Sequence, residues 1–319
     1  MSIIARTVGA MLAINSVVAG AQSWPTKPIR LISPFVPGGG ASLVARLIAP
    51  DLTEALGQSI VVDNRGGGGG VIGTEIAARA RPDGYTLVMG TASNFSVRPL
   101  VDRVPFDPLK DFAPIIHTTT VPLVLCVHPS VPAKSVKEFI ALGRSREAKL
   151  NFASSGEGTI SHLAAELFKM STGVQMSHVP YKGGGQAIID VIAGHVQLGF
   201  INILVASAQI KAERLRALAV TTPERSPVLP NVPTVAESGL AGYEVTQWSG
   251  MLAAAGTPVA IVARLNAEVD KILRKPLIQE RLSADGAQPG GGPPEKFAAF
   301  IKADIAKWSK VVKTAGLAK

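Results

Sequence analysis

The chain has 319 residues, enough for two domains, and its 47% hydrophobic and 17% charged residues are typical of a protein with a large buried core. The formal net charge is +9, which favours anionic ligands weakly; the Lys and Arg residues are dispersed and only 5% of residues are aromatic, which argues against nucleic-acid binding. The single cysteine, Cys126, lies in an apolar run and cannot form an internal disulfide.

The first 21 residues predict a removable export signal. Arg6 provides a positive charge, residues 8–18 are mostly apolar, and Ala19-Gly20-Ala21 offers the small residues that signal peptidase requires. The apolar stretch is too short for a membrane helix, which needs about 20 apolar residues. We therefore expect cleavage after Ala21. Because Arg6 is the only charged residue removed, the net charge falls from +9 to +8.

The segment after the signal alternates strands with helices, an order typical of parallel sheets flanked by helices. Apolar runs predict strands at residues 29–33, 59–63 and 85–90. Leucine and isoleucine recur at helical spacing between residues 43 and 56, and the next helix is expected to end at Arg79.

The same order restarts near residue 121. Strands are predicted at residues 121–127, 150–153, 177–179, 197–201 and 214–220. Helices are predicted at residues 159–172 and from Ser135, a favourable cap, to about residue 146.

The last third of the chain is predicted to return to the first group of strands. Residues 245–254 are apolar and extended enough to cross back, and amphipathic helices follow at 258–273 and 294–314. Two crossings imply a discontinuous domain, with residues 22–123 and 248–319 in lobe one and residues 124–247 in lobe two. We expect an α/β fold in which each lobe is a mostly parallel sheet flanked by helices.

A strand turns directly into a helix through glycines once in each lobe. The first glycine loop is residues 37–42 (PGGGAS) and the second is residues 154–159 (SSGEGT). Each loop presents backbone N–H groups at a helix start, where unsatisfied donors and the helix dipole favour an anion. Either loop alone is consistent with a simple helix cap. The pairing of two loops in corresponding places favours an anion held from both sides of a cleft.

Other motifs favour neither a cofactor, nor a metal, nor an enzyme. Gly68-x-Gly70-x-x-Gly73 matches the dinucleotide fingerprint, but the acid near the expected offset, Asp83, lies in a Pro-Asp-Gly turn instead of at a strand end. The five histidines lack metal-binding spacing. Ser154 and Ser155 lack an evident paired base and are interpreted as hydrogen-bond donors. Two roles remain open for His162: a donor facing the cleft, or a cap for neighbouring groups.

The chain resembles the Bug family, the extracytoplasmic solute receptors of tripartite tricarboxylate transporters. The matching stretches run almost end to end and include residues 37–39, 45–46, 62–65, 82–85, 151–156, 179–183, 215–220 and 233–235. The resemblance implies a two-lobed periplasmic-binding-protein fold of type II-like architecture, located in the periplasm, that closes on a carboxylated metabolite.

The resemblance also implies which residues hold the ligand carboxylate, partly through ordered water. They belong to the two glycine loops, a segment after the third strand, the following helix and one tyrosine. These residues are Gly38, Gly39, Gly40, Ala41, Ser42, Thr91, Ser93, Ser154, Ser155, Gly158, Thr159, His162 and Tyr181. Arg46, one turn inside its helix, is interpreted as structural.

Two departures from the family pattern concern the ligand. The family usually has Thr-Asp where this chain has Ala41-Ser42, and an acid where it has Ile201, with Asn202 beside it. An acid in the cleft suits an ammonium group. The absence of this acid favours a ligand without an ammonium group, such as a di- or tricarboxylate or an aromatic acid.

The preferred interpretation is a monomeric receptor that hands a small carboxylate to membrane transporter subunits and has no enzymatic activity. One alternative is a sensor that reports binding to a kinase. Another is a hydrolase that uses the cleft. It would need a base beside Ser154, Ser155 or Ser42, and the sequence offers only His162 for that role.

Overall fold

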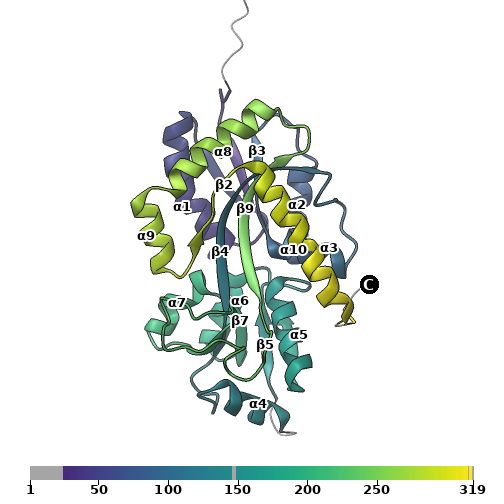
Figure 1. Cartoon of the computed structure of the whole chain (residues 1–319), viewed down its shortest axis with the longest axis vertical. Coiled ribbons are helices and arrows are strands. Elements are labelled where there is room, and N and C mark those ends of the chain that lie inside the picture. Colours follow the sequence, from purple (N-terminus) through teal and green to yellow (C-terminus); the bar gives the residue numbers. More distant parts are fainter. Residues whose placement is uncertain (1–23, 146–148, 315, 318–319) are drawn as a thin grey trace, which may run out of the picture.

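The computed structural model describes residues 24–145, 149–314 and 316–317. Figure 1 shows an elongated molecule in which two groups of helices and strands are joined by long strands passing between them. The export signal predicted for residues 1–21 lies outside the described residues. Within the described part of the chain, no helix combines the length and hydrophobicity needed to cross a bilayer.

Lobe one, the upper group in Figure 1, contains the N-terminal strands and the C-terminal helices. Its strands are β1 (Ile29–Ser33), β2 (Ile60–Asn64), β3 (Thr86–Thr91), the first part of β4 (Phe112–Val127), β9 (Thr246–Ala254) and β10 (Gln288–Pro289). Its helices are α1 (Gly40–Leu56), α2 (Val71–Ala78), α3 (Arg98–Val101), α8 (Val259–Leu273), α9 (Pro276–Ala284) and α10 (Pro294–Thr314), with a 3-10 turn at Gly68–Gly70 and a π-helical turn at Ala92–Val97.

Lobe two, the lower group, is built on the second part of β4. Its other strands are β5 (Asn151–Ser154), β6 (Ser177–Pro180), β7 (Leu198–Asn202) and β8 (Arg216–Val220). Its helices are α4 (Val136–Arg144), α5 (Ile160–Thr172), α6 (Gly184–Ile192) and α7 (Ile203–Lys211). The lobe boundaries at residues 123–124 and 247–248 stay a prediction.

Both lobes combine parallel and antiparallel pairing. The strand order is β2-β1-β3-β9-β4-β7-β5-β6, with β8 and β10 also paired to β4. Pairing is parallel within β2-β1-β3 and within β7-β5-β6, and antiparallel wherever β4 or β9 takes part. The sheets are therefore mixed, because the strands that connect the lobes run against their neighbours.

The connecting strand β4 is 16 residues long and belongs to both lobes. Residues 112–122 pair with β9, and residues 123–127 pair with β7 and β8. The sequence predicted only residues 121–127 of this strand. The earlier half was missed because it contains Pro114 and three consecutive threonines, and because register shifts after Pro114 and His117 interrupt its alternation.

Most other elements lie close to their predicted positions. The strand at residues 29–33 and the helix at residues 294–314 have the predicted bounds. The nine-residue helices α6, α7 and α9 were not predicted, because so short a segment shows too few turns for helical periodicity to stand out.

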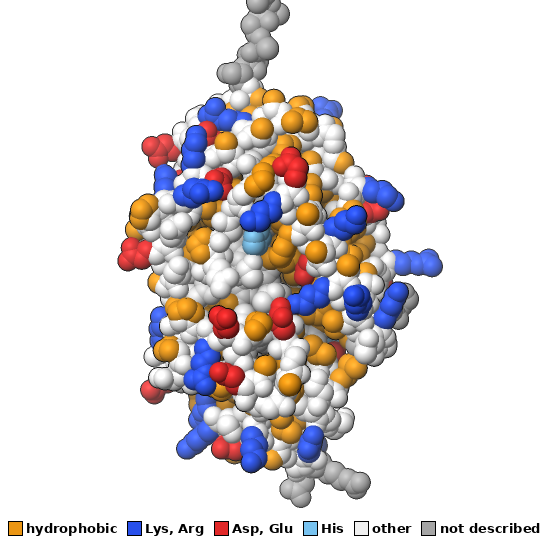
Figure 2. Space-filling view, viewed as in Figure 1, with side chains coloured by type: hydrophobic (Ala, Val, Ile, Leu, Met, Phe, Trp, Pro, Cys, Tyr) orange, Lys and Arg blue, Asp and Glu red, His pale blue; other side chains and the backbone are white. Residues whose placement is uncertain are grey.

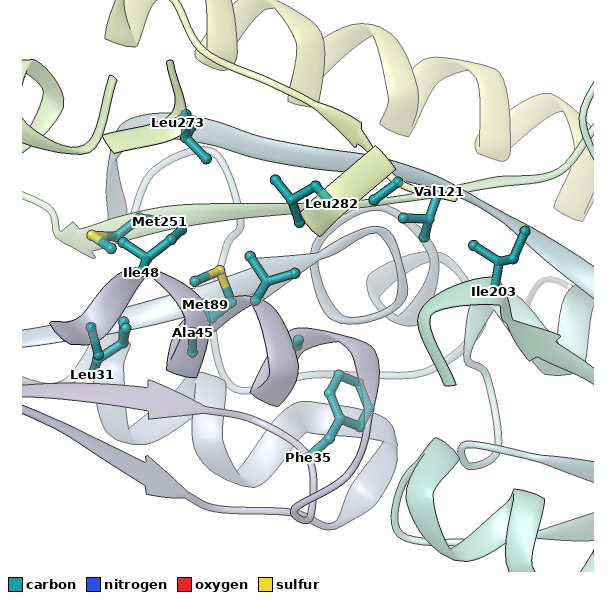
Figure 3. Close-up of a cluster of buried hydrophobic side chains, with 14 of the residues drawn as sticks. Leu31, Phe35, Ala45, Ile48, Met89, Val121, Ile203, Met251, Leu273 and Leu282 are labelled. Carbon is teal, nitrogen blue, oxygen red and sulfur yellow. The ribbon is translucent and has the colours of Figure 1, made fainter. Parts of the chain in front are cut away.

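The hydrophobic core continues from lobe one into lobe two. Figure 3 shows Leu31, Met89 and Met251 near Ile48 of α1, with Leu282, Val121 and Ile203 extending the cluster toward α7. Charged side chains of both signs are intermixed on the face shown in Figure 2, without a gathered basic surface there. The fold thus rests on buried apolar contacts, and the basic net charge is spread out.

Helix α10 is fixed to the crossing strand β9 by aromatic packing. The rings of Trp248 and Phe297 meet edge to face at 5.5 Å, and Trp248 Nε1 donates to Asp304 Oδ2 at 2.7 Å. Gly250 on β9 leaves the space that Phe297 fills: a Cβ at Gly250 would lie 2.1 Å from Phe297 Cζ.

We predict that Gly250→Ala lowers the free energy of unfolding by about 1–3 kcal/mol, because overpacking a filled core forces side chains and backbone to shift. Chemical denaturation measures this change. Gly184→Ala is the matched control, because a Cβ there meets no atom within 4 Å. Equal stability of the two variants would contradict the packing described here.

Candidate functional site

A small pocket of about 30 Å³, partly open to solvent, lies where the two lobes meet. Its walls come from lobe one, lobe two and both connecting strands. The lining residues are Phe35, Gly39, Gly40, Ala41, Leu123, Ser155, Ser161, Gly184, Ala187, Phe200, Ile201, Asn202 and Gln247. We call this space the cleft pocket.

Four helices begin at the cleft pocket. Gly40 is the first residue of α1, Gly184 is the first residue of α6, and Asn202 is the N-cap of α7. Ser161 is the second residue of α5. The start of a helix carries N–H groups without helical acceptors and the positive end of the helix dipole. Four helix starts around one space therefore favour an anion there.

Backbone donors remain available in the first turns of these helices. In α1 the N–H of Leu43 donates to Gly39 O at 3.0 Å, so the N–H groups of residues 40–42 lie ahead of the helical hydrogen bonds. In α6 the Gly183 carbonyl accepts from Gln186 and Ala187, both at 3.2 Å, and the N–H groups of residues 184 and 185 precede them. These groups are the donors that an anion would use.

The lining of the cleft pocket is uncharged. Of the residues that the structure describes, none with an ionisable side chain is among the lining residues. Four polar side chains (Ser155, Ser161, Asn202, Gln247) accompany large apolar ones such as Phe35 and Phe200. An ammonium group would find no carboxylate here, whereas an anion would find N–H and O–H donors beside an apolar wall suited to carbon atoms.

The lobes touch through glycines at the rim of the cleft pocket. A Cβ on Gly40 would lie 2.7 Å from Asn202 Nδ2, and one on Gly185 would lie 2.5 Å from the Pro37 carbonyl oxygen. On another part of the contact, the Ile160 N–H donates to Ser93 Oγ at 3.1 Å. The structure therefore holds the two lobes in close contact, with backbones nearer than side chains would permit.

Comparison with known proteins identifies the family. Residues 44–317 match TctC, the tripartite tricarboxylate transporter family receptor. The chain belongs to this receptor family. BugT of Bordetella pertussis is 34% identical to it over 99% of this chain and 98% of its own length.

Solved structures of similar proteins include two with bound acids. R. palustris Rpa4515 with adipate is 41% identical, with a TM-score of 0.90 over 92% of this chain and 99% of that one. MatC from Rhodopseudomonas palustris with bound malate is 32% identical, with a TM-score of 0.87 over 91% and 100% of the two chains. The Bug-family resemblance and the two-lobed periplasmic-binding-protein fold expected from the sequence are confirmed.

In this TctC receptor, some predicted ligand contacts line the cleft pocket and others lie around it. Gly39, Gly40, Ala41 and Ser155 are lining residues. Gly38 lies at the lobe contact, where its Cβ position is 3.6 Å from Gly185 Cα.

The side chains of Ser42 and Thr91 bond to neighbouring asparagines. Ser42 Oγ accepts from Asn64 Nδ2 at 3.1 Å, while Asn64 Oδ1 accepts from Arg46 at 2.9 Å, so Arg46 makes the structural contact expected of it. Thr91 forms a capping box with Asn94 at the start of the π-helical turn. These contacts hold the first glycine loop and the end of β3 in place.

Two hydroxyl groups of the second glycine loop bond within the loop, and the Ser155 hydroxyl bonds to that of Ser161 at 2.9 Å. The hydroxyls of Ser154 and Thr159 both donate to the Gly156 carbonyl, at 3.0 and 2.7 Å. The Gly158 N–H donates to His162 Nδ1 at 3.1 Å, which agrees with a capping role for this histidine. The Tyr181 hydroxyl donates to Asp190, and the backbone N–H of Tyr181 donates to the Ser154 carbonyl. Ligand contact by the thirteen predicted residues stays a prediction.

Nine lining residues were not predicted as ligand contacts. They are Phe35, Leu123, Ser161, Gly184, Ala187, Phe200, Ile201, Asn202 and Gln247. The start of α6 carried a signal similar to that of the other loops, three glycines (residues 183–185) between a strand and a helix. Asn202 carried a second signal, since asparagine at a strand end favours the N-cap of a helix.

A Ser–His pair lies behind the second glycine loop. Ser154 Oγ is 2.6 Å from His178 Nε2, but the Ser154 hydroxyl donates its single proton to the Gly156 carbonyl, so His178 is the donor in this pair and does not act as a base toward Ser154. The Ser154 side chain is fully buried, and neither residue lines the cleft pocket. Among the described residues, no group of three or more His, Cys, Asp or Glu could hold a metal ion. The pair contacts the loop through the Ser154–His178 hydrogen bond and lies outside the lining of the cleft pocket.

His162 and His178 stack on each other with ring centroids 3.9 Å apart and planes 8° from parallel. Burial, together with the charges of Lys169 and Arg98, lowers the pKa of His162 from 6.5 to about 4. Burial and the neighbouring His162 lower the pKa of His178 to about 4 as well. Both rings are thus neutral at pH 7, as the hydrogen bond from Gly158 to His162 Nδ1 requires.

We predict that the free energy of unfolding decreases as the pH falls from about 6.5 toward 4. In this range the unfolded chain binds protons that the folded histidines do not, which favours unfolding. For His162 the effect is at most about 3 kcal/mol. Urea denaturation between pH 7 and 4 measures it. His162→Gln keeps a neutral acceptor for Gly158 and should show a weaker pH dependence; an unchanged dependence would contradict this assignment.

Proposed function

We propose that this TctC receptor captures a small carboxylate between its two lobes and delivers it to the membrane subunits of a tripartite tricarboxylate transporter. The observation that carries the proposal is the convergence of four helix N-termini on an uncharged pocket between the lobes. The acids bound by the similar proteins Rpa4515 and MatC, adipate and malate, agree with it.

In this proposal the pocket-lining parts of both glycine loops contact the carboxylate directly. Gly39, Gly40 and Ala41 would donate backbone N–H groups from lobe one, and Ser155 would act from lobe two. The surrounding predicted residues, Gly38, Ser42, Thr91, Ser93, Ser154, Gly158, Thr159, His162 and Tyr181, would act through ordered water or by holding the loops.

The proposal includes the setting in which the protein works. It is exported with cleavage after Ala21, acts in the periplasm as a monomer and catalyses no reaction. The burial of Ser154 supports the absence of catalysis. Membership of the tripartite tricarboxylate transporter receptor family favours a transporter over a sensor kinase as the partner that receives the ligand.

We predict that carboxylates raise the unfolding temperature of the mature protein. The protein should be unfolded and refolded first, so that no co-purified ligand occupies the site. A ligand at 100 times its Kd adds about 2.7 kcal/mol to the free energy of unfolding, roughly 5 °C for a chain of this size. The panel contains succinate, malate, adipate, citrate, nicotinate, benzoate and terephthalate, and dimethyl adipate is the uncharged control.

A shift with at least one acid and none with the diester would support the proposal. An equal shift with the diester, or none with any acid, would contradict it, because charge recognition by the helix starts would then be irrelevant.

A second prediction concerns closure of the lobes. Gly40→Ala places a methyl group against the Asn202 amide, at a helix start where alanine itself fits the backbone. We expect the unfolding temperature without ligand to change little, because the lobes can separate and relieve this contact, and affinity for the acid found above to fall about tenfold or more, since overpacking the closed state costs about 1–3 kcal/mol. Calorimetric titration measures this, with Leu277→Ala, exposed on α9 and absent from the lining of the cleft pocket, as a control. Unchanged affinity would show that ligand binding does not require this close contact.

A further inference from the structure

The amide of Asn202 has a fixed orientation. Its Oδ1 accepts a hydrogen bond from the Leu204 N–H at 2.9 Å, as the N-cap of α7. A backbone N–H can only donate, so the amide oxygen must face Leu204 and the NH₂ group must face the opposite way. The fold of α7 thus determines which end of this side chain is presented to the cleft pocket.

The NH₂ group of Asn202 faces the start of α1. The Cβ position of Gly40 is 2.7 Å from Asn202 Nδ2 and 3.2 Å from Oδ1, so the nitrogen is the nearer atom. Both residues line the cleft pocket. In the described part of the chain, none of the hydrogen bonds found for Asn202 uses Nδ2 as donor. A donor with a fixed direction is therefore available between the lobes.

Gln247, the other amide of the cleft pocket, differs in this respect. It lies on the crossing strand β9, and no side-chain hydrogen bond was found for it within the described residues. Its amide can turn to present either the oxygen or the nitrogen. Asn202 cannot turn in this way without giving up the N-cap of α7, which makes Asn202 the discriminating residue of the two.

We propose that Asn202 is a specificity-determining residue that selects acids without an ammonium group. This rests on the function proposed above and makes it more specific. The fixed NH₂ group donates to a second oxygen-bearing group of the ligand, a carboxylate or hydroxyl, near lobe two. An ammonium in the same place would meet N–H donors, without a nearby charged acceptor in the pocket lining. The substrate class is therefore dicarboxylates and hydroxy acids.

The test is Asn202→Asp, which keeps the N-cap of α7 and replaces the hydrogen-bond donor presented to the ligand with an acceptor. Aspartate is as good an N-cap as asparagine, so the unfolding temperature without ligand should change little. The Nδ2 donor becomes a carboxylate oxygen. Calorimetric titration should use ligands that differ only in the ammonium group, with succinate against aspartate and glutarate against glutamate.

For the wild type we expect the acid without the ammonium group to bind more tightly in each pair. In Asn202→Asp its affinity should fall about 10- to 100-fold, the usual effect of losing a hydrogen bond to a charged group. The preference over the amino acid should shrink or reverse. Asn202→Ser, which keeps a capping oxygen but lacks the amide donor, should show a smaller loss. Gln279→Glu, which adds the same charge on exposed α9, should bind as the wild type does.

The outcomes separate this inference from the proposed function. If the wild type binds an acid but Asn202→Asp leaves the preference between paired ligands unchanged, Asn202 does not select the ligand and the inference is overturned. Wild-type preference for aspartate or glutamate would overturn it too, while the carboxylate receptor would stand. If the wild type binds no carboxylate, the proposed function itself fails.

Discussion

The antiparallel pairing of β4 with β9 sets the position of the two lobes relative to each other. Both strands pass between the lobes, and their pairing runs from Phe112 opposite Ala254 to Pro122 opposite Thr246. Beyond that point β4 continues into lobe two, where β7 and β8 pair with it. The strand ladder therefore fixes the position of α5, α6 and α7 opposite α1. The cleft pocket exists because this placement brings their first turns together.

The proposed recognition of an anion without charged side chains accounts for the polar contacts around the cleft pocket. Backbone N–H groups act as a site only if their loops are held rigidly, because a mobile loop loses direction and dipole alignment. Asn64 holds the first glycine loop through Phe35 and Ser42, and the hydroxyls of Ser154 and Thr159 bond to the Gly156 carbonyl of the second loop. The neutral pair of His162 and His178 supports the same loop from behind. These groups shape the pocket although they do not line it.

The sequence predicted the strands, the main helices and the pairing of glycine loops because these follow from local patterns. It could not predict which hydroxyls point toward a ligand. Ser154 bonds to His178, 24 residues away, and Ser93 bonds to Ile160 in the other lobe, so their directions depend on tertiary placement. The start of α6 could have been predicted as part of the site, since its glycines resemble those of the two glycine loops. Asn202 was visible only as the neighbour of the departure at Ile201, and the orientation of its amide required the cap on Leu204.

A pocket built from helix starts also suits a protein that must release what it binds. The donors are divided between the lobes, with α1 on one side and α5, α6 and α7 on the other. Separation of the lobes would remove α1 from the ligand and admit water to the remaining N–H groups, and helix-terminus electrostatics are strongly weakened by water. A lysine or arginine would keep its charge beside the ligand after opening. The uncharged lining therefore couples binding strength to the distance between the lobes, which is the variable that a membrane partner can change.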